Sequence, residues 1–283
     1  MDKFNHPNHV RQNGFQSLNQ TRISATTILG RLLIGVAATV LILANNAGAE
    51  ESENHLFILS GQSNMTGGLE ASFAQAVEGV FGDQNVTVVR SSKSGRGIRF
   101  WDEHYQFPSN YKFPGKGAPE KKHFQQHGQL YGPLIQAIQS ATQDQSYDTI
   151  TFIWMQGESD AGRGLEEVYE QSFLRLLGRL KTDLKRDDLN FVIGRLSDAQ
   201  MDNAHWRNVR KVQVKLGEDH EMGAWINTDD LNGGEADKPG GDVHYPQAKI
   251  KILGERFAAK AVELIRKESA NAGKVIETQG KLK

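Results

Sequence analysis

From residue 50 onward, the chain alternates short, largely apolar runs with longer runs whose apolar residues recur every three or four positions. The short runs are rich in β-branched and aromatic residues, which is typical of strands buried on both faces of a parallel sheet. They predict five strands, at residues 55–60, 86–91, 149–155, 190–196 and 223–227. The longer runs predict helices at residues 128–142, 165–185 and 206–216, and from Pro246 onward. This alternation indicates βαβ units and an α/β fold with a central parallel sheet of about five strands.

The first 49 residues differ from the rest. Residues 1–31 are polar, with four basic residues and one acidic residue, and residues 32–44 form an apolar run that is short for a membrane span. Ala47-Gly48-Ala49 then matches the Ala-x-Ala pattern of a signal-peptide cleavage site. We therefore expect an export signal at residues 1–49 and a periplasmic or secreted protein. The alternative is an uncleaved membrane anchor, which is the only contact with a membrane that the sequence suggests.

Residues 50–268 contain neither an internal repeat nor a linker, so they predict one domain, followed by a polar tail at residues 269–283 that we expect to fray. Two stretches inside the domain lack periodicity, residues 92–125 and 229–241. Long irregular loops in compact domains are often functional. The first contains several aromatic residues, Trp101 among them, which could stack on a sugar or simply pack beneath the loop.

Composition excludes several classes of function. The chain has 33 Lys and Arg against 34 Asp and Glu, so it lacks the basic surplus of a nucleic-acid-binding protein. It has no cysteine, which excludes thiol catalysis, zinc–thiolate sites and disulfides. His123 and His127 have the spacing of a metal pair on a helix, but the segment is rich in lysine and has no carboxylate partner. We interpret it as a solvated face and expect neither a metal nor a cofactor.

Polar residues follow the predicted strands at the points where they end. Ser63 follows the first strand, residues 94–97 the second and residues 156–160 the third, while residues 242–245 lie between the last strand and the last helix. In a parallel sheet these segments converge at one end. A serine, a histidine and carboxylates that meet there suit nucleophilic acyl transfer. Backbone amides at glycine turns and a side-chain amide suit stabilisation of an oxyanion.

Three blocks of residues carry a family resemblance. Gly61-Gln62-Ser63-Asn64-Met65, Gln156-Gly157-Glu158 and Asp242-Val243-His244-Tyr245 resemble the blocks of the sialate O-acetylesterase-like domain, a group of carbohydrate esterases in the SGNH hydrolase superfamily. The resemblance spans residues 56–266. It implies a three-layer α/β/α sandwich with flavodoxin-like strand order.

The resemblance also implies roles for single residues. Ser63 is the expected nucleophile and His244 the expected base. The oxyanion hole is expected to combine the amides of Ser63 and Gly95 with the side chain of Gln156. We expect Gln62, Asn64 and Trp101 to contact substrate.

One position departs from the superfamily pattern, which has an aspartate three residues before the histidine. Gly241 occupies that position here, and Asp242 lies two residues before His244. We expect Asp242 to orient the imidazole, with Glu158 as the alternative.

The function that the resemblance implies is a serine esterase that removes O-acetyl groups from a carbohydrate through an acetyl-serine intermediate. The sugar, whether sialate or an acetylated polysaccharide, stays open. An alternative is a non-catalytic carbohydrate-binding protein on an esterase scaffold, which would have no need for both Ser63 and His244. A lipase or thioesterase would require a large apolar groove. The loops around the site are polar and rich in glycine, so they contain few residues that could line one.

Overall fold

The computed structural model describes residues 53–113, 126–143, 145–233 and 242–280, with side chains in the last helix up to residue 270. The expected export signal or anchor at residues 1–49, and His123, lie outside the described residues. None of the helices within these ranges combines the length and apolar character needed to cross a membrane.

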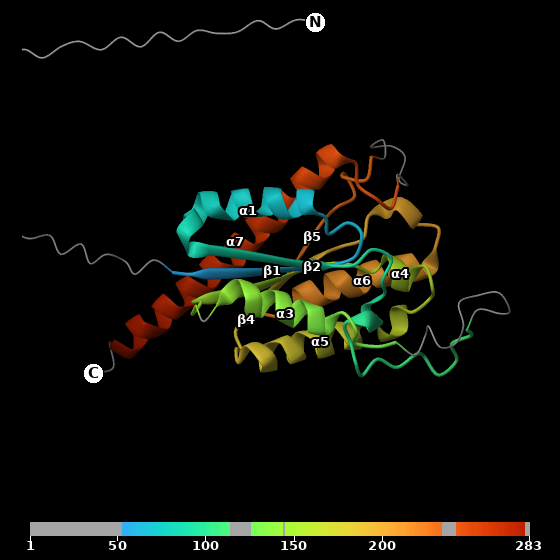
Figure 1. The fold of residues 1–283 in the computed structure, drawn as a ribbon, viewed down its shortest axis with the longest axis horizontal. Coiled ribbons are helices and arrows are strands. Elements are labelled where there is room, and N and C mark those ends of the chain that lie inside the picture. Colours follow the sequence, from blue (N-terminus) through green and yellow to red (C-terminus); the bar gives the residue numbers. More distant parts are fainter. Residues whose placement is uncertain (1–52, 114–125, 144, 234–241, 281–283) are drawn as a thin grey trace, which may run out of the picture. The chain divides into compact units, whose positions relative to one another are not determined.

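Five strands form one sheet in which every strand is parallel to its neighbours (Figure 1). Their order is β2-β1-β3-β4-β5. Their bounds are β1 His55–Gly61, β2 Val86–Ser92, β3 Thr149–Met155, β4 Leu189–Gly194 and β5 Gly223–Ile226. This confirms the predicted parallel α/β sheet and its flavodoxin-like order. In such a sheet the chain changes direction between β1 and β3, and ligands bind beyond the carboxyl ends of those strands.

Helices cover both faces of the sheet and complete a three-layer sandwich (Figure 1). One face carries α1 (Gly67–Phe81) and α7 (Gln247–Gly280). The other carries α3 (Tyr131–Thr142), α5 (Tyr169–Leu184) and α6 (Ala204–Asp219). Side chains in β1 alternate between the two cores, because successive residues of a strand point to opposite faces. Both faces are thus apolar, as the unbroken apolar runs indicate.

The sequence patterns did not predict α1. Its signals are present, because the Thr66 Oγ1 accepts a hydrogen bond from the Leu69 N–H at 3.2 Å and caps the helix. Leu69, Phe73 and Val77 then form a buried stripe at intervals of four residues. Glycines at both ends of the helix lower its intrinsic propensity and obscure this stripe. At the other end of the chain, the backbone of α7 continues to Gly280, within the polar tail defined from sequence.

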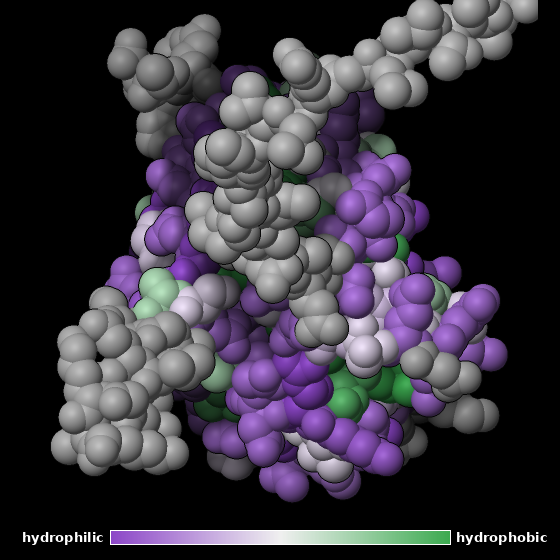
Figure 2. Space-filling view, turned by 90° about the vertical axis from the view of Figure 1, so that its left-hand side faces the viewer, coloured by the Kyte–Doolittle hydropathy of each residue, from purple (hydrophilic) through white to green (hydrophobic). Residues whose placement is uncertain are grey.

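At the end of the molecule where the strands begin, the described surface is mainly hydrophilic, with apolar residues in small patches (Figure 2). The large apolar side chains lie instead in two clusters, one on each side of the sheet. Polar chemistry at the opposite, carboxyl end of the sheet therefore rests on an apolar scaffold on both faces.

The backbones of β1 and β3 approach each other closely where β1 ends. Gly61 has a φ of +142°, and a Cβ atom at this residue would lie 2.0 Å from the Met155 carbonyl oxygen. That oxygen accepts a hydrogen bond from the Gln62 N–H at 2.9 Å. Glycine is required here both for its conformation and for space. The contact fixes the turn that follows β1 against the end of β3.

Gly61→Ala should destabilise the fold by about 3 kcal/mol or more, because the methyl group clashes with backbone and the conformation is strained. Gly79→Ala in α1 is the matched control, since its added Cβ would meet nothing within 4 Å. It should leave stability unchanged or raise it by up to about 1 kcal/mol, because alanine is the better helix former. Urea unfolding followed by circular dichroism measures both; equal stability of the two variants would contradict the argument.

Candidate active site

Ser63 and His244 form a direct side-chain contact at the carboxyl end of the sheet. Ser63 lies in the turn between β1 and α1, and His244 in the segment that leads into α7. The His244 Nε2 and the Ser63 Oγ are 3.0 Å apart. Ser63 is half-buried and the His244 side chain is 59% exposed, so the pair is accessible from solvent. An imidazole at this distance can take the proton of the hydroxyl as the oxygen attacks a carbonyl carbon.

The two carboxylates considered from sequence lie in different places. An Asp242 Oδ1 atom is 3.8 Å from the His244 Nδ1 and accepts the His244 backbone N–H at 3.2 Å. Glu158, at the start of the short helix α4 (Glu158–Ala161), instead accepts a hydrogen bond from the Asn64 Nδ2 at 2.8 Å. Within the described residues Glu158 has neither a hydrogen bond nor an ion pair with His244. Of the two, Asp242 is therefore the carboxylate beside the imidazole.

The carboxyl group of Glu158 is shielded from water. Burial raises its pKa to about 7, and hydrogen bonds from its own backbone and from Asn64 oppose this shift only in part. The Oε2 atom is buried without a hydrogen-bond partner among the described residues. A substantial fraction of the protein consequently carries a neutral Glu158 near pH 7.

Gln156 does not direct its side-chain amide toward Ser63. Its Nε2 donates to the Gln62 Oε1 at 3.2 Å, the Arg96 carbonyl oxygen at 3.2 Å and the Asp160 Oδ2 at 2.6 Å. The side chain is wholly buried. Since its donors already face three acceptors, the structure corrects the expectation that Gln156 lines the oxyanion hole. Gln156 instead braces the end of β3 against the loop after β2.

Asp160 is a buried residue of the site to which the sequence analysis gave no role. In addition to the Gln156 amide, it accepts the Ile98 N–H at 2.9 Å, and burial raises the pKa of its carboxyl group. The sequence does place Asp160 near the site, because Asp160 lies two residues after the Gln156-Gly157-Glu158 block. Nothing in the pattern, however, indicates that it faces inward.

Trp101 is a core residue and not a sugar platform. It is 1% exposed and packs edge-on against Trp154, with ring centroids 5.1 Å apart. This burial contradicts the expected contact with substrate and favours the alternative of local packing.

Gln62 and Asn64 are also buried, and the bonds described above tie them to neighbouring segments. The Gln62 Oε1 accepts the Gln156 amide and the Ser159 N–H at 3.3 Å. Its Nε2 has no acceptor among the described residues, so Gln62 can still donate to a ligand. Asn64 has protein partners at both ends of its amide, Glu158 and the His244 segment, so this geometry does not support the expected contact of Asn64 with substrate.

Two backbone amides at the site are free to stabilise negative charge. Within the described part of the chain, the N–H groups of Ser63 and Gly95 donate to no protein acceptor. Gly95 lies in the loop after β2, is exposed and has a φ of +68°. Both amides follow strand ends at the carboxyl end of the sheet, where an oxyanion hole is expected.

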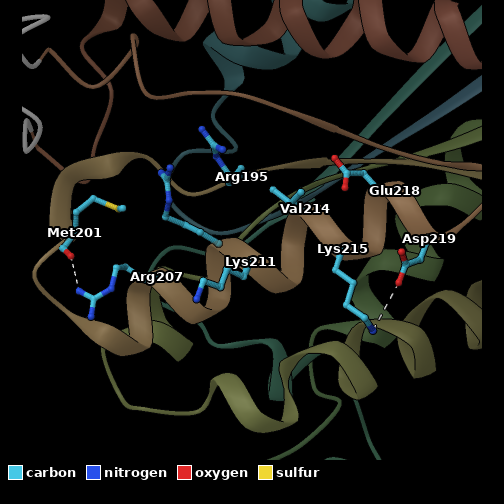
Figure 3. Close-up of a pocket in the computed structure, with 9 residues that line it drawn as sticks. Arg195, Met201, Arg207, Lys211, Val214, Lys215, Glu218 and Asp219 are labelled. Atoms are coloured by element: carbon cyan, nitrogen blue, oxygen red, sulfur yellow. Dashed lines mark hydrogen bonds and ion pairs between the residues drawn. The ribbon is translucent and has the colours of Figure 1, made fainter.

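A separate groove of about 460 Å³ runs along α6 (Figure 3). It is lined by Arg195, Met201, Arg207, Arg210, Lys211, Val214, Lys215, Glu218 and Asp219, and not by Ser63 or His244. Much of its positive charge is already balanced. Arg195 and Arg210 share Asp229, while Lys215 pairs with Glu170 and Asp219.

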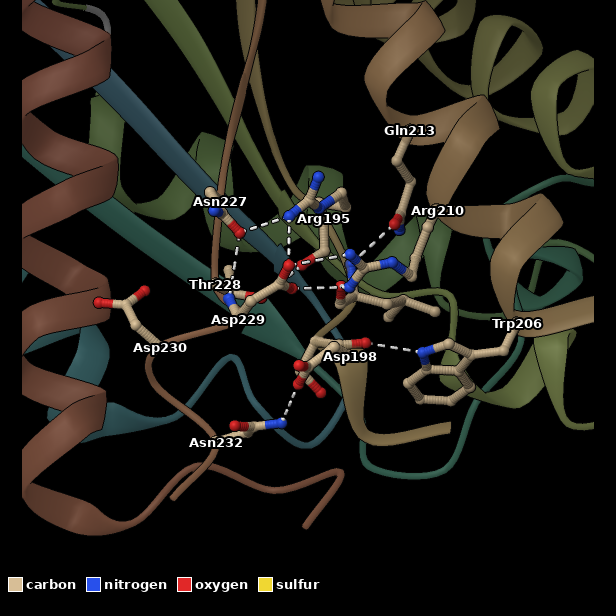
Figure 4. A network of polar contacts seen from close by, with 12 residues as sticks. Arg195, Asp198, Trp206, Arg210, Gln213, Asn227, Thr228, Asp229, Asp230 and Asn232 are labelled. Atoms are coloured by element: carbon tan, nitrogen blue, oxygen red, sulfur yellow. Dashed lines mark hydrogen bonds and ion pairs between the residues drawn. The ribbon is translucent and has the colours of Figure 1, made fainter. Parts of the chain in front are cut away.

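The Asp229 ion pairs belong to a wider network at the carboxyl ends of β4 and β5 (Figure 4). The Thr228 hydroxyl in this network donates to the Arg195 carbonyl oxygen at 2.7 Å and contacts the Tyr245 hydroxyl at 2.8 Å. Tyr245 directly follows His244. The network therefore anchors the segment that carries the imidazole.

Replacing Glu158 by glutamine should stabilise the protein in a pH-dependent way. The Glu158 pKa is about 7 in the fold against 4.5 for a free side chain, so the folded state holds the proton more tightly. The free energy of unfolding then falls as pH rises from about 4.5 to about 7, because the ionised carboxylate is costly to bury. Glutamine has no such cost and keeps an oxygen for the Asn64 hydrogen bond.

We therefore expect Glu158→Gln to melt at a higher temperature than wild type at pH 8, with the gap shrinking toward pH 4.5. Thermal melts at a series of pH values measure this, with the exposed Glu167→Gln as control. A gap that stays constant with pH would show that ionisation of Glu158 is not responsible.

The sequence matches a family model described as carbohydrate esterase, sialic acid-specific acetylesterase, over residues 67–263. The match includes Glu158, Asp242 and His244, and it begins at the first residue of α1, just after Ser63. A sequence search among curated proteins finds no match.

Solved structures of similar fold include the following two. A protein from Arabidopsis thaliana is 16% identical with a TM-score of 0.53, and the alignment covers 75% of this chain and 98% of that protein. A carbohydrate acetylesterase from Xanthomonas citri is 16% identical with a TM-score of 0.50, over 72% of this chain and 55% of the other. At such identity, this likeness concerns the fold alone. Because the family model spans more than half of the sequence, the chain belongs to the carbohydrate esterase family of the sialic acid-specific acetylesterases.

Proposed function

We propose that this protein is a serine esterase that removes O-acetyl groups from a carbohydrate, with Ser63 as nucleophile and His244 as general base. The observation that carries the proposal is the 3.0 Å contact between the Ser63 Oγ and the His244 Nε2. Membership in a carbohydrate esterase family supports the substrate class. A non-catalytic carbohydrate-binding protein is the alternative, but binding alone gives no reason to align a hydroxyl with an imidazole.

The reaction has two halves. The Ser63 Oγ attacks the acetyl carbonyl carbon while His244 takes the hydroxyl proton, and His244 then returns a proton to the departing sugar oxygen. The product of this half is an acetyl-serine. A water molecule, deprotonated by His244, then attacks the acetyl carbon; the bond from this carbon to the Ser63 Oγ breaks, His244 returns the proton to the Oγ, and acetate is released. The free N–H groups of Ser63 and Gly95 stabilise the negative oxygen in both halves.

Asp242 is proposed to orient the imidazole. An acid beside the Nδ1 favours the tautomer that leaves Nε2 free to accept the serine proton, and it stabilises the imidazolium that forms. The 3.8 Å separation of the Asp242 Oδ1 from the His244 Nδ1 supports this role. None of the proposed steps requires a metal or a cofactor.

The proposed substrate is an acetylated sugar, with sialate favoured by the description of the family and acetylated polysaccharide as the alternative. The exposure of His244 suits an ester carried on a bulky glycan, because the reacting atoms are reached from the surface. We further propose that residues 1–49 direct export, with cleavage after Ala49 at the Ala-x-Ala pattern. The enzyme would then meet its glycan outside the cytoplasm.

Ser63→Ala should abolish acetate release, because the nucleophile is removed while only one half-buried oxygen atom is lost. Release is measured first with p-nitrophenyl acetate and then with O-acetylated sialic acid and acetylated xylan. Ser146→Ala, an exposed serine before β3, is the matched control and should keep full activity. Undiminished turnover in Ser63→Ala would refute the serine mechanism.

Asp242→Asn should lower kcat, by up to about 10⁴-fold as in serine proteases whose orienting aspartate is replaced, with little change in KM. The asparagine keeps the shape of the side chain but favours the wrong imidazole tautomer. Asp187→Asn is the control, because Asp187 is exposed and lies between α5 and β4, away from His244 in the sequence; it should leave kcat unchanged. If Asp242→Asn turned over like wild type, Ser63 and His244 would act without Asp242.

A further inference from the structure

The side-chain amide of Asn64 spans three segments of the chain. Its Nδ2 donates to the Glu158 Oε1 at 2.8 Å and to the Val243 carbonyl oxygen at 3.0 Å. Its Oδ1 accepts the Tyr245 N–H at 3.4 Å. The amide faces acceptors on one side and a donor on the other, so only one orientation satisfies its partners. Asn64 is also buried, at 2% exposure, so water cannot replace these bonds easily.

The partners of Asn64 lie on either side of the proposed base. Val243 and Tyr245 are the chain neighbours of His244, and Asn64 is the chain neighbour of Ser63. One side chain consequently joins the turn of the nucleophile to the backbone on both sides of the imidazole. This joint matters because the His244 side chain is largely exposed and has little packing of its own.

Glu158 is the partner of the Asn64 amide that lies outside the His244 segment. Its carboxyl oxygen accepts a hydrogen bond from the Asn64 Nδ2, and among the described residues it has neither a hydrogen bond nor an ion pair with His244. Glu158 itself is held at the start of α4, directly after the β3 end that Gln62 and Gln156 brace. The end of β3 thus fixes the position of Glu158. Asn64, which bonds to Glu158 and to both chain neighbours of His244, links the His244 segment to this fixed point.

We propose that Asn64 and Glu158 are positioning residues that keep the His244 imidazole aligned with Ser63 by clamping the backbone on both sides of His244. The inference rests on the proposed function, in which His244 is the base for Ser63. It gives Glu158 a role different from that of an orienting acid. Glu158 acts as a hydrogen-bond acceptor, through Asn64, and its negative charge is not needed.

A set of four variants separates these roles. Asn64→Ala removes all three bonds, and Asn64→Asp keeps the volume but loses the two donated bonds. Glu158→Gln keeps an acceptor oxygen for Asn64, whereas Glu158→Leu removes it and fills the space. Asn208→Ala, at an exposed asparagine on α6, is the matched control for loss of an amide.

Steady-state kinetics with p-nitrophenyl acetate supply the first readout. We expect Asn64→Ala, Asn64→Asp and Glu158→Leu to lower kcat about 10²-fold, the scale of loss when a reacting group is displaced by about 1 Å. KM should stay within about twofold, because neither residue is proposed to contact substrate. Glu158→Gln and Asn208→Ala should retain most of the wild-type kcat.

The second readout is the rate at which a fluorophosphonate probe labels Ser63, measured on protein that circular dichroism shows to be folded. The rate reports the alignment of Ser63 and His244 and does not depend on a sugar site. It should fall in parallel with kcat in the three damaging variants. Loss of stability alone would change the melting temperature but not the labelling rate of the folded fraction. If Glu158→Leu does not fold, the two Asn64 variants and Glu158→Gln still decide the question.

The outcomes are distinguishable. Wild-type kcat and labelling in folded Asn64→Ala would overturn the clamp. Equal losses in Glu158→Gln and Glu158→Leu would also overturn it, because the charge of Glu158 would then be what matters. Ser63→Ala is assayed in parallel: full activity there defeats the proposed function itself, whereas an inactive Ser63→Ala beside an active Asn64→Ala defeats only the clamp.

Discussion

The close contact between the ends of β1 and β3 is the constraint from which the rest of the site follows. Gly61 lies so near the Met155 carbonyl that no larger residue fits, and the Gln62 N–H bonds to that same carbonyl. The turn carrying Ser63 is thereby set against the segment that begins at Gln156. Side-chain contacts between the two segments, such as that of Gln62 with Gln156, depend on this distance. The site is consequently fixed at the point where the chain reverses its direction across the sheet.

At the carboxyl end of the sheet, polar side chains are buried in a layer where apolar ones would be usual. Gln156 and Asp160 bond to each other and to the backbone of the loop after β2. Leaving one member of such a layer without its partner costs about 1–3 kcal/mol. An interlocked layer of this kind holds the loops after β1, β2 and β3 in one relative arrangement. An apolar core could fill the same space, but it would not define the direction of each loop as sharply.

Parts of this arrangement could be predicted from sequence and parts could not. The five strands were predictable because apolar, β-branched and aromatic residues predominate in each short run. The proximity of Ser63 and His244 was predictable because parallel strands end on one side of a sheet. Helix α1 was missed because its glycines mask a buried stripe. The roles of Gln156 and Trp101 were misassigned because position along a chain does not reveal whether a side chain faces a cleft or the interior. Coordinates were needed to see which of Asp242 and Glu158 lies beside the His244 imidazole, since both follow strands at the same end.

The contact between Ser63 and His244 joins residues 181 positions apart. The serine is synthesised early, and the histidine comes just before α7, the final helix, which packs against α1 near the start of the domain. Contacts between such distant residues form late in folding, because a long loop must close first. In the proposed mechanism, a chain whose synthesis has not yet reached residue 244 therefore carries the nucleophile without its base. The proposed activity accordingly requires that the segment carrying His244 has been synthesised and has packed beside Ser63.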